Sequence, residues 1–291
     1  MDPRRLELLL ELSRRGSMRE VADALHLTTS TVSQQLAVLA REASAPLLEP
    51  DGRRVRLTPA GRRLADHAVT VLAALEAARA DLDPTAAPRG EVRVAAFATA
   101  VRRSLLPVSR VLLSEHPEVR LVISEHEPSE AYELLAADDV DLALTYDYNL
   151  APATFDRSVR ARPLWEVPWS VGAPSGTDDA GSSLEVFDRL RDSDWIVNSR
   201  NTADEDAVGT IASLAGFSPR VVHRADSLDL VQELVVEGFG VGLLPSDQPV
   251  RDGVALLPLR DPVVHLRAYA CTRRGREAWP PLALLLRLLT P

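Results

Sequence analysis

Residues 28–35 concentrate side chains that form hydrogen bonds, at the start of a predicted helix. These hydroxyl and amide groups belong to Thr28, Thr29, Ser30, Thr31, Ser33, Gln34 and Gln35. The first N–H groups of a helix lack intrahelical partners and carry a partial positive charge, so they suit a phosphate. Short hydroxyls allow a close approach to base edges, and the Gln34 amide matches the adenine edge in the major groove. The pattern indicates contact with DNA, with ordinary helix capping as the alternative.

An arginine pair is a second candidate for contact with nucleic acid. Arg53 and Arg54 follow Asp51-Gly52, a dipeptide typical of a tight turn between two strands. Guanidinium groups at the tip of such a hairpin suit DNA phosphates. A solvated surface turn is the alternative interpretation.

Further along the chain, polar residues recur where predicted strands end or helices begin. Ligands of α/β sheets bind beyond the carboxyl ends of parallel strands, beside helix starts. The loops at these places supply the candidate ligand-binding residues Ala98, Thr99, Ala100, Arg102, Glu127, Tyr146, Asn198, Ser199, Asp226 and Ser227. Helix capping and loop solvation are the alternative roles. We expect the Thr99 and Ser199 hydroxyls to face one cleft, and Arg102 or Arg200 to hold a carboxylate unless they are merely solvated.

The sequence contains no familiar pattern of a catalytic or metal site. The six histidines are scattered, and neither HExxH nor CxxC spacing occurs. There is no Gly-x-Ser-x-Gly motif, and the glycines of residues 238–242 precede a predicted strand instead of following one. Cys271 lies in an apolar strand, which favours an inert core residue over a redox sensor. We therefore expect no enzymatic activity, no cofactor and no metal.

The elements that carry the first group of residues form a predicted winged helix-turn-helix. Apolar residues at helical spacing mark three helices, interrupted at Gly16 and across residues 26–28. Ser17 and Glu20 have the spacing of a capping box at the second helix. Two short helices across a tight turn, followed by a basic hairpin, are typical of this fold.

One long helix is predicted from Pro59 to Leu82, with proline in the first turn. Its apolar stripe comprises Leu64, Ala68, Val71, Leu72, Leu75 and Ala78. Because little else in this region can cover the stripe, we expect it to pair with a second chain. Residues 83–90 have the composition of a linker.

Strands and helices alternate after residue 90, which predicts α/β sheets with helices on both faces. The predicted strands are residues 91–97, 119–125, 140–145, 195–197, 220–223, 240–244 and 263–271. The predicted helices are residues 101–115, 129–137, 204–215, 227–237 and 279–289. A crossing near residues 162–170, and the return of 263–271 to the first sheet, predict two lobes.

Composition and charge are compatible with this organisation. A chain of 291 residues is too long for one compact core, and its net charge of −9 is unevenly distributed. Residues 1–63 carry eleven arginines against eight acids, a balance of +3, whereas residues 91–291 carry twenty against thirty, a balance of −10. Such asymmetry suggests a DNA-facing head on an acidic body. We find no secretion signal or membrane span and expect a cytoplasmic protein.

These segments, taken in order, resemble the LysR-type transcriptional regulators along the whole chain. The densest similarity lies in Gly16-Ser17-Met18, residues 21–25 and 31–36, and Leu57-Thr58-Pro59-Ala60-Gly61. Later segments resemble the family's periplasmic-binding-protein-like effector domain, namely Leu106-Pro107, His116-Pro117, residues 140–144 and residues 238–245. The chain departs from the family at Ser30, Ser44, Leu48 and Pro50, where proline, glycine, phenylalanine and arginine are usual. The last change removes a typical phosphate contact and leaves that role to Arg53 and Arg54.

The resemblance implies a bacterial regulator that binds operator DNA under the control of a small-molecule effector. It implies a winged helix-turn-helix in residues 1–58, a linker helix and hinge in 59–90, and an effector domain in 91–291. Lobe I would comprise about 91–162 and 263–291, and lobe II about 163–262. Homodimers pairing into a homotetramer, and RNA polymerase as a further partner, are also implied. A solute-binding protein or enzyme built on residues 91–291, and a regulator with a vestigial cleft, are the competing interpretations.

Overall fold

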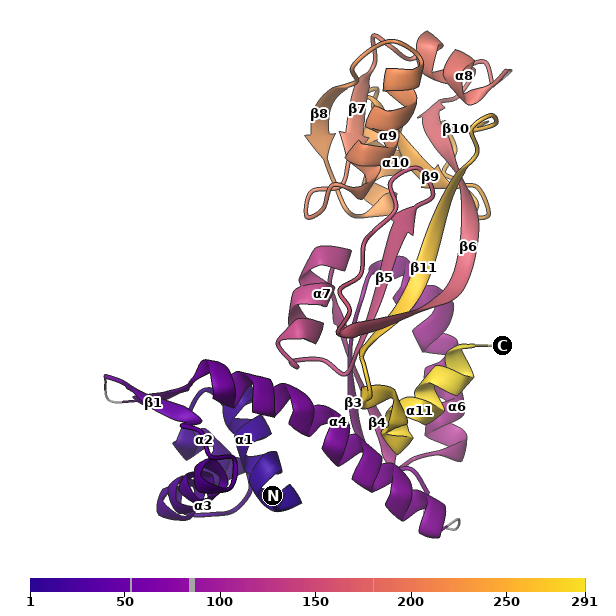
Figure 1. The fold of residues 1–291 in the computed structure, drawn as a ribbon. Helices are drawn as coiled ribbons and strands as arrows, with labels where there is room; N and C mark the ends of the chain where they lie inside the picture. Colours follow the sequence, from indigo (N-terminus) through magenta and orange to yellow (C-terminus); the bar gives the residue numbers. More distant parts are fainter. Residues whose placement is uncertain (53, 84–86, 180, 291) are drawn as a thin grey trace.

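The computed structural model describes residues 1–52, 54–83, 87–179 and 181–290, and for Arg54 it describes only the backbone. The proposed contact of Arg53 therefore lies outside the described residues. Figure 1 shows an N-terminal helical head, the long helix α4 (Pro59–Leu82), and an elongated body above that helix.

The head has the predicted winged helix-turn-helix fold. Asp2 caps the first helix, and Gly16 ends it with a left-handed φ of 68°. The apolar faces of the three helices meet at Leu9, Val21 and Leu36, which are fully buried. The elements are α1 (Pro3–Arg15), α2 (Met18–Ala24), α3 (Thr29–Glu42), and the antiparallel hairpin of β1 (Leu48–Asp51) and β2 (Arg54–Leu57).

The expected capping box at the start of α2 does not form. Ser17 occupies the N-cap position, but its side chain accepts no hydrogen bond from the helix. Arg19 and Glu20 are exposed, so water can satisfy the first N–H groups of this short helix.

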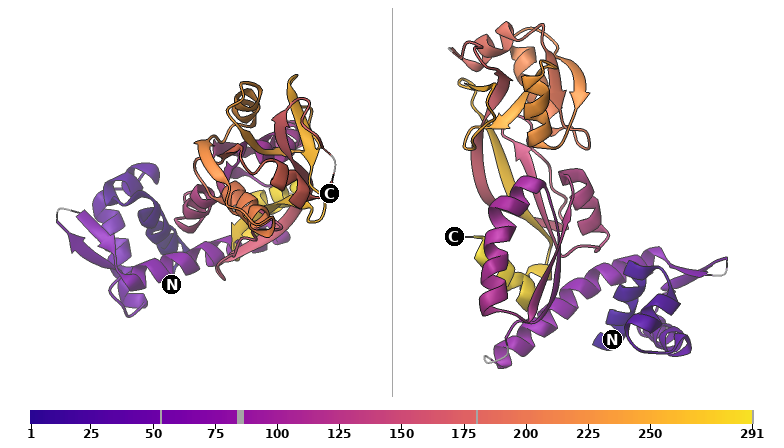
Figure 2. Two further views of the ribbon diagram at one scale, coloured as in Figure 1. Left: turned by 90° about the horizontal axis from the view of Figure 1, so that it is seen from above. Right: turned by 180° about the vertical axis from the view of Figure 1, so that it is seen from behind.

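Helix α4 has the predicted bounds, but more of its apolar stripe is covered within the chain than expected, because Leu64, Ala68 and Leu72 pack in the head core. Ala65, beside the stripe, joins the same core, and Ala73 packs into the core of the body. The Asp66 carboxylate pairs with Arg273 at 2.6 Å, and the Thr70 hydroxyl donates to the carbonyl of Arg274 at 3.1 Å. Figure 2 shows α4 passing from the head beneath the body in both further views. The helix thus connects the two parts by direct packing.

The body is built on one mixed sheet whose two halves are the predicted lobes. Lobe I contains β3 (Gly90–Ala96), α5 (Ala98–Ala100), the π-helical turn η1 (Val101–Leu105), α6 (Leu106–Glu115), β4 (Val119–Glu125), α7 (Pro128–Ala136), β5 (Leu142–Tyr148), η2 (Arg276–Ala278) and α11 (Pro280–Leu289). Lobe II contains α8 (Ser183–Arg189), β7 (Asp194–Val197), α9 (Ala203–Leu214), β8 (Arg220–Arg224), α10 (Leu228–Val236), β9 (Val241–Pro245) and β10 (Val254–Pro258).

Two long strands, β6 (Val159–Pro174) and β11 (Val264–Arg273), join the lobes. Along the described chain the sheet order is β4-β3-β5-β11-β6-β9-β7-β8, with β10 paired to the far end of β6. The return of β11 to the first sheet is confirmed, because it pairs antiparallel with β5. The segment predicted as a crossing is itself a strand, so one continuous sheet replaces the two separate ones expected.

Helices cover both faces of the sheet, as predicted. In β3, Val94 and Ala96 face the core under α6 and α11, whereas Ala95 faces the smaller core under α7. Figure 1 shows α7 on one side of lobe I, with α6 and α11 on the other. Cys271 in β11 is fully buried, and burial raises the pKa of its thiol to about 11, which suits an inert core residue.

Candidate functional sites

The polar residues predicted for DNA contact occupy the amino end of α3, mostly on its exposed surface. Thr28, Thr29, Ser30, Ser33 and Gln34 are exposed, and Thr31 and Gln35 are half-buried. The Thr28 hydroxyl caps the helix by accepting from the N–H of Thr31 at 3.1 Å.

Besides the N-cap residue Thr28, three members of this group are engaged within the head. The Gln35 side-chain oxygen accepts a hydrogen bond from Arg5 Nε at 2.9 Å, which ties α3 to α1. Thr31 Oγ1 lies 2.8 Å from Thr28 Oγ1. Ser30 Oγ lies 2.9 Å from the same Thr28 Oγ1, so Thr29, Ser33 and Gln34 have the freest hydrogen-bonding groups on this surface.

The hairpin predicted as the wing is present. Gly52 turns with a φ of 59°, and Asp51 and Arg54 are paired across the strands. On the described side chains of the hairpin, Arg56 Nε pairs with Glu49 at 2.8 Å. The turn geometry matches the sequence prediction, whereas the contacts of Arg53 and Arg54 remain predictions.

A cavity of about 380 Å³ lies where the two lobes meet, and most of the predicted ligand-binding residues line it. They are Ala98, Thr99, Arg102, Glu127, Tyr146, Asn198, Asp226 and Ser227. The loops after β3, β4 and β7 and the N-terminus of α10 bring these residues together, as expected of parallel strand ends. A volume of this size is suited to a small molecule.

Two predicted residues do not line the cavity. Ala100, the last residue of α5, is fully buried in the core. The N–H of Ser199 donates to Asp226 Oδ1 at 2.8 Å, and its hydroxyl donates to Asp226 Oδ2. Asp226 thus holds Ser199 at the rim, and the expectation that Thr99 and Ser199 face the cavity together is fulfilled only for Thr99.

The structure adds lining residues that the sequence interpretation missed. They are Phe97, Glu125, Trp169, Ile196, Asp204, Ala225, Leu228, Val231, Leu243 and Leu266. Most are apolar and resemble ordinary core residues in the sequence. Asp204 occupies the first turn of α9 together with Glu205 and Asp206, so its sequence context signals only a favourable helix dipole. Arg200, expected from the sequence to hold a carboxylate, also lines the cavity.

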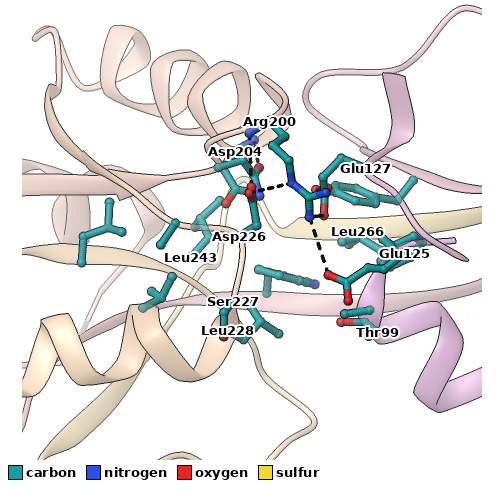
Figure 3. A pocket seen from close by; sticks show the side chains of 18 of the residues that line it. Thr99, Glu125, Glu127, Arg200, Asp204, Asp226, Ser227, Leu228, Leu243 and Leu266 are labelled. Carbon is teal, nitrogen blue, oxygen red and sulfur yellow. Dashed lines mark hydrogen bonds and ion pairs between the residues drawn. The ribbon is translucent and has the colours of Figure 1, made fainter. Parts of the chain in front are cut away.

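Arg200 crosses between the lobes instead of pointing into empty space. Its guanidinium pairs with Asp226 of lobe II at 3.0 Å, and with Glu130 and Glu125 of lobe I at 3.3 and 3.6 Å. Figure 3 shows this side chain between Asp226 and Glu125. Burial alone would raise the pKa of Asp226, but hydrogen bonds from Ser199 and Arg200 outweigh it and lower that pKa.

The deeper carboxylates of the cavity behave in the opposite way. Burial raises the pKa of Glu127, although the Tyr146 hydroxyl donates to it at 3.0 Å. Burial also raises the pKa of Asp204 to about 7, and the Tyr148 hydroxyl donates to it at 2.7 Å. A site with buried, poorly compensated carboxylates discriminates strongly between ligand charges.

The described residues contain no group of three or more His, Cys, Asp or Glu side chains arranged to hold a metal ion. A search of the same residues found no helix long and apolar enough to cross a membrane.

A winged helix-turn-helix connected by a long helix to a two-lobed domain with an interlobe cavity defines a ligand-responsive DNA-binding regulator. Residues 3–62 match the bacterial regulatory helix-turn-helix model of the lysR family, and residues 85–291 match the LysR substrate binding domain. The chain belongs to the LysR family, whose members are transcriptional regulators and not enzymes.

Known relatives span nearly the same length. The transcriptional dual regulator GltC of Bacillus subtilis is 28% identical over 248 residues, which cover 84% of this chain and 81% of GltC. The transcriptional activator IlvY of Salmonella typhimurium is 26% identical over 301 residues, 99% of each chain. A full-length OxyR variant from Pseudomonas aeruginosa has the same fold, with a TM-score of 0.73 at 20% identity, covering 99% of this chain and 93% of that one.

Proposed function

We propose that this regulator reads operator DNA through the exposed amino end of α3, and that a small molecule in the interlobe cavity controls that binding. One observation carries the proposal: a single chain combines an exposed polar helix start beside a hairpin with a cavity built from strand ends. Thr29, Ser30, Ser33 and Gln34 are the residues that we assign to the major groove, and Arg53 and Arg54 to phosphates. A structure of the relative CbnR has been solved with its target DNA, at a TM-score of 0.53 to this chain.

The remaining assignments are part of the same proposal. Residues 1–58 are the DNA-binding domain, 59–90 the linker helix and hinge, and 91–291 the effector domain. The exposed face of α4 joins two chains into a homodimer, and dimers pair into a homotetramer. RNA polymerase is a further partner, and the protein acts in the cytoplasm. Differential binding of the effector to two lobe arrangements would shift the placement of the heads on DNA.

The DNA assignment is tested with two glutamine substitutions of equal size. Gln34→Ala removes a side chain that we place on a base edge, whereas Gln248→Ala removes an exposed glutamine of lobe II. A good contact to a base contributes about 1–3 kcal/mol, so Gln34→Ala should weaken binding to promoter DNA by about tenfold or more. Fluorescence anisotropy should show no change for Gln248→Ala. Equal affinities of the two variants for promoter DNA would show that Gln34 does not contact the DNA.

The cavity is tested separately from the head. Thr99→Val should weaken the response to any true effector, because Thr99 lines the cavity, while leaving operator binding without effector intact. Operator titrations with metabolites measure both quantities at once. A constitutive regulator whose cavity is vestigial would bind operator normally and respond to none of them.

A further inference from the structure

Carboxylates outnumber cations around the interlobe cavity. The lining includes Glu125, Glu127, Asp204 and Asp226, but only two guanidiniums, those of Arg102 and Arg200. With all six groups ionised, the four negative and two positive charges leave a balance of −2. Arg200 is shared among several of these acids, as described above. The excess negative charge would therefore repel an anionic ligand.

Two of these carboxylates are buried without full compensation. Asp204 is 8% exposed, and no Arg, His or amino-terminal nitrogen among the described residues lies within ion-pair distance of it. Glu127 is 5% exposed and accepts from the Tyr146 hydroxyl and the Asn201 amide, while its ion pair with Arg200 is long, at 3.9 Å. Ionised groups in such positions are destabilising, and a cationic nitrogen nearby would offset that penalty.

A third observation is independent of the acids. Trp169 lines the cavity, is only 5% exposed, and has an indole N–H with no hydrogen-bond acceptor among the described residues. A buried donor without a partner is unusual, and a ligand oxygen would satisfy it once a change in the contacts between the lobes opens the indole nitrogen, which has almost no accessible surface here. Trp169 joins Phe97 and Tyr146 on the cavity wall, and aromatic rings favour cations over anions.

The contacts of Arg200 show that the carboxylates of this site bind a cation. Its guanidinium comes from lobe II and binds carboxylates of both lobes, so it occupies the place that a ligand cation would contest. A competing cation would release Arg200 and change the contacts between the lobes. The site thus has a built-in means of linking cation binding to lobe arrangement.

We infer, on the basis of the proposed function, that the effector is a small organic cation that also carries a hydrogen-bond acceptor. A protonated amine or guanidinium lies against Glu127 and Asp204, and a carbonyl or carboxylate oxygen accepts from Trp169. Arg200 competes with this ligand for the carboxylates at the rim.

The test uses the full-length protein and probes that differ mainly in charge. L-arginine and L-ornithine are the cationic probes, L-citrulline is the neutral counterpart of arginine, and succinate is the anionic probe. Calorimetric titration and thermal unfolding, at concentrations up to about 10 mM, should show stabilisation by at least one cationic probe and none by succinate. Citrulline should bind about tenfold more weakly than arginine, or worse.

Variants place the binding in the cavity. Glu127→Gln and Asp204→Asn should each weaken binding of the cationic probes by about tenfold, since each removes one negative charge but keeps one acceptor oxygen. Glu115→Gln makes the same charge change at an exposed residue at the end of α6 and should have no effect. Arg200→Met should tighten cation binding, which a merely structural role of Arg200 would not do.

Three results would overturn the inference. The first is equal binding of the cationic probes to wild type, Glu127→Gln and Asp204→Asn. The second is stabilisation by neither cationic probe. The third is binding of succinate that is lost in Arg102→Ala, in which case the cavity remains the effector site but the ligand class is wrong. The proposed DNA binding by the head is tested separately with Gln34→Ala, and its outcome does not depend on these results.

Discussion

Asp204 should make the stability of the effector domain depend on pH. Burial raises its pKa from 3.8 to about 7, with Glu127 and Asp226 adding repulsion, while the hydrogen bond from Tyr148 opposes the shift. The folded state therefore retains a proton that the unfolded chain releases, so this group destabilises the fold as pH rises from about 4 to 7. A rise of the pKa from 3.8 to about 7 corresponds to at most about 4 kcal/mol. Above pH 7 the loss is complete and constant.

Asp204→Asn should remove this slope, because the amide stays neutral and still accepts from Tyr148. We expect urea unfolding to find the variant close to wild type at pH 4 and more stable by up to about 4 kcal/mol at pH 8. A difference that is constant with pH would mean that Asp204 does not titrate in this range. A variant less stable than wild type at pH 8 would contradict the role of burial.

For single residues, the sequence predicted which positions after strand ends line the cavity, but it did not predict how deeply each side chain is buried. Thr99, Arg102 and Asn198 were expected at the ligand because they follow strands, and they line the cavity. Ser199 has the same sequence context as Asn198, but Asp226 holds it away, a contact between distant residues that no local pattern predicts. Trp169 was missed because an aromatic residue in a strand is usually part of the core.

At the scale of elements, helix α7 has one end at the cavity and the other end at the DNA-binding head. Glu127 precedes it at the cavity, and Asp138 follows it next to the head, where Arg14 of α1 pairs with Asp138 at 2.7 Å. Both partners are largely buried, and Arg273 adds a weaker contact to Asp138 at 3.4 Å. One helix thus lies between the cavity and the DNA-binding head.

The pair should therefore contribute measurably to docking of the head. A double-mutant cycle of Arg14→Met and Asp138→Asn, followed by urea unfolding, should give a coupling energy of about 1–3 kcal/mol. Arg15→Met is the matched control, since Arg15 is exposed and pairs with Glu11 within α1, and it should cost less than about 1 kcal/mol. A coupling energy near zero would mean that the head is not held to the body through this contact.

Helix α4 leaves a narrower apolar face for a second chain than its sequence indicated. Leu72 packs partly into the head core, whereas Val71 is 43% exposed. Val71→Asp should place a charge in the dimer interface at a cost of several kcal/mol, and light scattering should then show smaller assemblies. Leu113→Asp, at a leucine 78% exposed on α6, is the control and should leave the assembly unchanged. Unchanged assembly in Val71→Asp would place the interface elsewhere.

Helical periodicity predicted the bounds of α4, but prolines concealed the length of β6. Pro163 and Pro168 lie within this strand, and proline usually excludes a central strand because it cannot donate a ladder hydrogen bond. Residues 159–168 pair with β11 on one side only, and β9 and β10 join β6 from residue 169 onwards. The open edge tolerates both prolines. Local sequence cannot show which edge of a strand is unpaired.

The whole molecule combines a basic head with an acidic body. The balance of +3 in residues 1–63 supports attraction to DNA, while the −10 of residues 91–291 keeps the rest of the chain from binding it indiscriminately. This division followed from the sequence alone. The packing of α4 and α1 against the body did not, because it depends on contacts between residues up to about 200 positions apart, such as Asp66 with Arg273.

The most direct test of the account is a comparison of two DNA molecules of equal length. One contains the promoter region upstream of the gene that encodes this chain, and the other contains the same bases in scrambled order. Anisotropy titrations of the full-length protein at physiological salt should show at least about 1,000-fold tighter binding to the promoter, with both affinities falling as salt rises. Equal affinity for the two molecules, or binding to neither, would contradict the assignment of this chain as a sequence-specific regulator of that promoter.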